Sequence, residues 1–207
     1  MRIVVAIRLL ASLAAAGLAA GCASPPMKYY TLSPAQWVAT GSSQRTLQAV
    51  VAVRSVPAGL DTAALVVRRG DTQVELAEGA RWTAPFADEV REALNEALRR
   101  EYGIAVVDIS PSHAPPLPRV DVSVRKFDAT VGDSVSLIAD WTVTYQAPAG
   151  PEHLVCSSLL KEAAGVGLDG VVKASQALVV RLAHDVGGAL AATAANKAPE
   201  CRSDHEL

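Results

Sequence analysis

The chain has 207 residues and is nearly neutral, with 19 Lys and Arg against 21 Asp and Glu and a net charge of −2. This balance excludes a generic nucleic-acid binder, which would carry a basic patch and a high isoelectric point. Half of the residues are hydrophobic and 19% are charged, which excludes a disordered charged tail. Three cysteines are too few for a disulfide-built miniprotein, and the length suits one domain with an ordinary core.

Residues 1–21 are predicted to be a lipoprotein signal peptide. Arg2 and Arg8 supply positive charge, and the Ala/Leu-rich stretch around and after them is too short for a membrane span. It leads into the sequence Leu-Ala-Ala-Gly-Cys at residues 18–22, which resembles a bacterial lipobox with its leucine one position early.

Cys22 is the predicted lipidation site, because a cysteine thiolate is the nucleophile that can take a diacylglycerol group. Several acyl chains of the palmitate kind would anchor the protein firmly. Ala23 replaces the aspartate of an inner-membrane retention signal, which favours the periplasmic face of the outer membrane. Residues 22–46 would then form a lipid-anchored N-terminal segment. The alternatives are ordinary signal cleavage, with Cys22 as a bystander, and no cleavage.

The first half of the body is predicted to contain strands and one clear helix. A continuous apolar run over 48–53 indicates a buried strand, and two alternating segments around Gly70-Asp71 indicate a hairpin. Apolar residues at every third or fourth position predict a helix, with Thr83 as its N-cap and Gly103 as its end.

The second half repeats the alternation of strands and helix, with no sign of a second domain. In chain order it is predicted to hold a core strand over 104–109, a proline-rich loop over 110–118, strands over 120–124, 135–145 and 154–160, and a helix over 171–195. The adjacent Gly187-Gly188 should weaken this last helix in its middle. This order of elements predicts a single α/β domain.

Motifs for catalysis and metal binding are missing from the sequence. The four histidines lack a ligand-type spacing to one another or to cysteine, and there is no nucleophile elbow, phosphate-binding loop or His-Glu-x-x-His pair. Asp140 and the adjacent His184-Asp185 are interpreted as surface residues. We therefore expect no catalytic residue, no metal and no cofactor.

Cys156 and Cys201 are the two cysteines that remain besides Cys22. In the oxidising periplasm a disulfide between them is a fair hypothesis, and it would pin the C-terminal tail to the strand over 154–160. Two separate thiols are the alternative.

Aromatic side chains are the candidates for contact with a partner or with lipid headgroups. Tyr29 and Tyr30 could serve in this way, or they could pack the first strand. Trp37, Trp82 and Trp141 are assigned to the core.

Several segments, in order and spacing, resemble the ABC-type transport auxiliary lipoprotein family (PqiC-like). Phe86 stands where the family usually has leucine. The segments are Cys22 followed by residues 29–32, residues 51–61, 65–68 and 75–78, the run Arg-Trp-Thr-Ala-Pro-Phe at 81–86, and residues 173–178 and 182–186.

The resemblance implies an α/β domain over 47–196, with a mixed sheet and two main helices packed on one side, followed by a tail over 197–207. It also implies a non-enzymatic tether or dock at the outer membrane. The implied partners are a periplasmic MCE-domain protein of a lipid transport system and its inner-membrane transporter, and a homo-oligomer is an option. The family supplies no catalytic residue to carry over.

Two other classes remain open from the sequence. One is a lipoprotein regulator of a periplasmic cell-envelope enzyme, such as a cell-wall synthase. The other is an anchored hydrolase whose catalytic groups are scattered along the chain, although no nucleophile and base are recognisable.

Overall fold

The structure is a computed structural model, and it describes residues 26–33, 47–107 and 116–201. The predicted signal peptide, Cys22, Trp37 and most of the predicted proline-rich loop lie outside these ranges. In chain order the elements are β1 (Lys28–Tyr30), β2 (Leu47–Ser55), the 3-10 turn η1 (Ala58–Leu60), β3 (Ala64–Arg69), β4 (Gln73–Trp82), α2 (Phe86–Tyr102), β5 (Ile104–Val106), β6 (Arg119–Ala129), β7 (Ser134–Ala147), β8 (Gly150–Ala163) and α3 (Gly167–Ala194).

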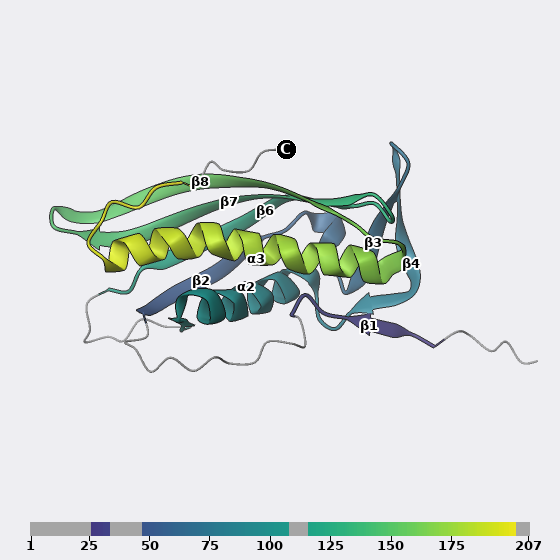
Figure 1. Cartoon of the computed structure of the whole chain (residues 1–207), viewed down its shortest axis with the longest axis horizontal. Coiled ribbons are helices and arrows are strands. Elements are labelled where there is room, and N and C mark those ends of the chain that lie inside the picture. The colour runs from purple at the N-terminus through teal and green to yellow at the C-terminus, as the bar shows by residue number, and fades with distance from the viewer. Residues whose placement is uncertain (1–25, 34–46, 108–115, 202–207) are drawn as a thin grey trace, which may run out of the picture.

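The strands form two sheets, a five-stranded one in the order β5-β2-β6-β7-β8 and a three-stranded one in the order β1-β4-β3. The larger sheet is mixed, because β2 runs parallel to β5 and β6 whereas β7 is antiparallel to both of its neighbours. Helices α2 and α3 lie side by side against one face of this sheet (Figure 1). The predicted α/β class, mixed sheet and one-sided helices are confirmed, with the hairpin strands and β1 set apart in a second sheet.

The core lies between the large sheet and the two helices, where strand residues of one parity point inward. On β6 and β7 most inward positions are buried, as the alternation in the sequence predicts, and Phe127 and Tyr145 are partly buried. Trp82 and Trp141 are 3% and 2% exposed, so both are core residues as expected.

Helix α2 begins at Phe86 and ends at Gly103, which adopts the left-handed conformation with a φ of 63°. The end matches the sequence prediction, but the N-cap does not. Pro85 occupies the N-cap position and makes no side-chain hydrogen bond there. Thr83 instead directs its hydroxyl to the carboxylate of Glu89, a buried acceptor that competes with the helix terminus.

Helix α3 continues without a break through Gly187-Gly188. The first of these glycines has a packing role. A Cβ atom at Gly187 would lie 2.4 Å from the ring of Tyr102, so glycine there lets the end of α2 approach α3. By length and composition α3 could cross a membrane, but half of its most apolar window is buried in the protein. Its packing on the sheet makes it the core helix of the domain.

Candidate functional site

A chain of buried polar groups lies in the core, and it corrects one interpretation of the sequence. The indole N–H of Trp141 donates to Ser158 Oγ at 2.9 Å, and the Ser158 hydroxyl donates to Asp185 Oδ2 at 2.6 Å. Asp185 is 2% exposed, so it is not a surface residue as the sequence suggested. Ser158 is also 2% exposed, and we assign this hydrogen-bonded pair of buried side chains a structural role.

The other polar residues singled out in the sequence occupy ordinary structural positions. The Tyr102 hydroxyl donates to the carbonyl oxygen of His184 at 3.0 Å and lies 3.3 Å from Nδ1 of its ring. Asp140 pairs with Arg125 on the exposed face of the large sheet. Among the described residues, no group of three or more His, Cys, Asp or Glu side chains could hold a metal ion.

Glu89 joins the N-terminal segment to the start of α2, and sequence reasoning missed it. Its Oε2 accepts from the Thr31 hydroxyl at 2.9 Å and from the Leu32 N–H at 2.8 Å. Its Oε1 accepts from the Thr83 hydroxyl and from the Ala84 N–H at 3.2 Å. The carboxylate is only 4% exposed, and its signal in the sequence was merely that of an acid in the first helical turn.

Tyr29 and Tyr30 point to opposite sides of β1, so the structure separates the two candidates. Tyr29 is 65% exposed. The Tyr30 hydroxyl donates to Asp169 Oδ1 at 2.9 Å, at the start of α3. Desolvation, this hydrogen bond and the negative charge of Asp169 all raise the pKa of Tyr30. Tyr30 therefore fixes β1 to α3, whereas the ring of Tyr29 is available for contact.

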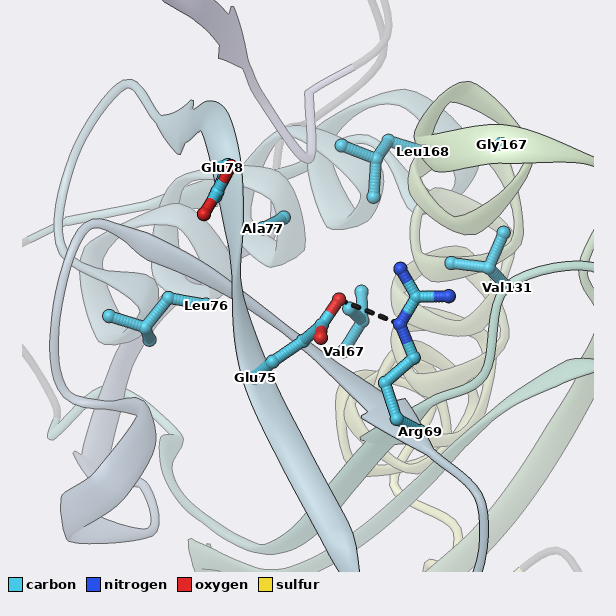
Figure 2. A pocket seen from close by; sticks show the side chains of 9 residues that line it. All are labelled: Val67, Arg69, Glu75, Leu76, Ala77, Glu78, Val131, Gly167 and Leu168. Atoms are coloured by element: carbon cyan, nitrogen blue, oxygen red, sulfur yellow. Dashed lines mark hydrogen bonds and ion pairs between the residues drawn. The ribbon is translucent and has the colours of Figure 1, made fainter.

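A groove lies between the β3–β4 hairpin and the start of α3 (Figure 2). Its volume is about 600 Å³, and its apolar lining includes Val67, Val131 and Leu168. Arg69 Nε pairs with Glu75 Oε1 at 2.7 Å, with the guanidinium directed toward Val131. The groove therefore combines apolar side chains with the charged groups of Arg69, Glu75 and Glu78, a mixed lining that suits binding of an amphipathic group.

A second groove of about 340 Å³ adjoins the first along β4 and is lined by residues of β1 and the start of α3. The two share Glu78, Gly167 and Leu168. We call the region formed by β1, the β3–β4 hairpin and the start of α3 the hairpin end of the domain. It is the candidate binding region.

Cys156 and Cys201 are bonded to each other in the structure, with Cα atoms 5.6 Å apart. Cys156 lies on β8, an edge strand of the large sheet, and the chain after α3 runs back to it. The bond thus holds the C-terminal segment against a sheet edge that would otherwise be open at this point.

The chain is similar to one protein family and to several solved structures. Residues 30–187 match the family model of the ABC-type transport auxiliary lipoprotein component. A crystal structure of an uncharacterized protein superposes with a TM-score of 0.63 at 18% identity, covering 78% of this chain and 97% of the other. A Xanthomonas campestris protein assigned to family DUF330 has a TM-score of 0.57 at 16% identity, covering 78% and 93%. No curated protein sequence matches this chain significantly.

Proposed function

Because the chain belongs to the ABC-type transport auxiliary lipoprotein family, we propose that it is the outer-membrane lipoprotein of an MCE-type lipid transport system. Family membership makes it an accessory lipoprotein of an ABC-type transporter in the bacterial envelope. The finer proposal is a non-enzymatic role. Acyl chains on Cys22 hold the domain at the periplasmic face of the outer membrane, where it docks or tethers the periplasmic MCE-domain protein.

The observation that carries this proposal is the extent of the family match, which runs from the last residue of β1 through all of β2–β8 and α2 to Gly187 in α3. The position of β1 supports it. Lys28 begins β1 six residues after Cys22. Six residues of fully extended chain reach about 20 Å. The folded domain therefore has to stand next to the membrane that holds the anchor.

Partner capture tests the assignment. The protein is purified from membranes in mild detergent, and copurifying proteins are identified by mass spectrometry. We expect an MCE-domain protein and its inner-membrane transporter. Recovery of a cell-wall synthase without an MCE-domain protein would contradict the proposal and favour a regulator of an envelope enzyme.

Removal of the acylation site tests the anchor. The Cys22→Ala variant should leave the membrane fraction and lose activity in an envelope-stress assay. Ser203→Ala is the control, because it replaces a side chain of similar size but leaves both the acylation site and the Cys156–Cys201 bond in place. Full activity of the Cys22→Ala protein would show that tethering is not essential.

A further inference from the structure

Large exposed apolar side chains gather at the hairpin end of the domain. Elsewhere in the described ranges, only Val155 and Leu159 on β8 are large, apolar and exposed. Single exposed apolar residues are ordinary, but a group at one end of a small domain indicates a contact surface. The group, here called the end cluster, consists of Met27 (44% exposed), Tyr29 (65%), Val74 (55%), Leu76 (63%) and Val166 (90%).

The end cluster is also the part of the domain closest along the chain to the proposed anchor. Met27 follows Cys22 by five residues, which span at most about 18 Å when fully extended. Strand β1 lies at the same end of the molecule as the β3–β4 hairpin and the start of α3 (Figure 1). The turn between β7 and β8 and the end of α3 lie at the far end.

The direction of β1 is fixed by contacts with both helices. The Tyr30 hydroxyl donates to Asp169 on α3, and the side-chain amide of Gln176, also on α3, donates to the carbonyl oxygen of Thr31 at 2.9 Å. Leu32 is 1% exposed, and its N–H donates to Glu89 on α2. Because β1 is fixed to both helices, an anchor at Cys22 keeps the hairpin end of the domain close to the membrane.

We propose that the hairpin end rests on the lipid surface of the outer membrane, with the end cluster in the interfacial region. The inference depends on the acylation of Cys22 proposed above and adds the orientation of the domain. A bilayer surface suits these groups, because a tyrosine ring and a methionine can enter the interface while Lys28, exposed between them, stays among the headgroups. The far end of the domain then points into the periplasm.

Quenching of tryptophan fluorescence measures this orientation. The acylated protein is placed in vesicles of phosphatidylethanolamine and phosphatidylglycerol with bromine atoms on the acyl chains. Tyr29→Trp and Val166→Trp place reporters in the end cluster, and Val155→Trp is the matched control at an exposed valine on β8. All three positions are well exposed, so the fold should tolerate the exchange. The parent protein supplies the background emission.

We expect the added emission at positions 29 and 166 to be quenched at least about twofold more strongly than that at 155. Equal quenching at all three positions, or none at 29 and 166, would overturn the proposed orientation. In the second case the end cluster would be free for a protein partner. Intact mass of the same sample reports the acyl chains on Cys22. An unmodified Cys22 would overturn the anchor itself, whereas the identity of the transport partner does not affect the quenching.

Discussion

Replacement of Glu89 tests the junction between the N-terminal segment and the domain. All four groups that contact its carboxylate are hydrogen-bond donors, two on each oxygen. In Glu89→Gln the side-chain amide keeps one oxygen but places an NH2 group where two donors now point. A threonine hydroxyl can rotate to accept from this NH2 group, whereas a backbone N–H cannot.

The magnitude follows from the number of groups left without an acceptor. In Glu89→Gln one backbone N–H loses its hydrogen bond to the carboxylate and is left without an acceptor. We expect this to lower the free energy of unfolding by about 2–3 kcal/mol. Glu89→Ala leaves the N–H groups of Leu32 and Ala84 without their acceptor and opens a small space, which gives about 3–5 kcal/mol.

Urea denaturation followed by far-UV circular dichroism measures these losses as shifts of the midpoint at an unchanged slope. Asp88→Asn is the matched control. It also removes one negative charge, at the neighbouring residue, and the Asp88 side chain is 44% exposed. It should cost less than about 1 kcal/mol. A Glu89→Gln protein within about 0.5 kcal/mol of the wild type would refute the reasoning, because the acceptor role would then be dispensable.

Three further predictions follow from single contacts. Gly187→Ala should destabilise the protein by about 1–3 kcal/mol through overlap with the ring at the end of α2, whereas Gly188→Ala should be neutral or stabilise it by up to about 1 kcal/mol; equal melting temperatures for the two variants would contradict this packing. For the Cys156–Cys201 bond, the intact mass of the unreduced protein after alkylation should show no free thiol at either position. Reduction should lower the free energy of unfolding by up to about 4 kcal/mol, because the unfolded chain gains loop entropy. Two alkylated thiols in the unreduced protein would disprove the bond. The pKa of Tyr30 is raised in the folded protein, so the stability that its neutral hydroxyl contributes is fully present below pH 10.0 and is lost as the pH rises through the higher folded-state pKa. The free energy of unfolding of the wild type should therefore exceed that of Tyr30→Phe by less at alkaline pH. A difference that does not change with pH would contradict this prediction.

Local patterns in the sequence determined most of the elements of this fold. The alternation over 135–145 gave the inward and outward faces of β7, and Gly70 and Gly103 marked a turn and a helix end that the structure contains. These features depend on residues close in sequence, so their periodicity and backbone preferences are visible without a fold. The order of motifs also carried the family resemblance, which the family match confirms.

The candidate site was only partly visible in the sequence. Tyr29 and Tyr30 were singled out together, but only the position of Asp169, 139 residues after Tyr30, separates their roles. The groove beside them joins a hairpin to the start of α3, two segments that nothing in their local patterns connects.

Only the tertiary structure shows that Asp185 and Glu89 are buried and hydrogen-bonded. The sequence pattern places Asp185 on the surface of a helix. In the fold it accepts a hydrogen bond from Ser158 on β8, 27 residues earlier in the chain. Glu89 looked like an acid that favours a helix N-terminus until the segment at Thr31 and Leu32 supplied half of its hydrogen bonds. The sequence by itself determined which segments are helices and strands, because those preferences are local. Whether a carboxylate is solvated or buried depends on donors brought from distant segments, and only the packed fold places them.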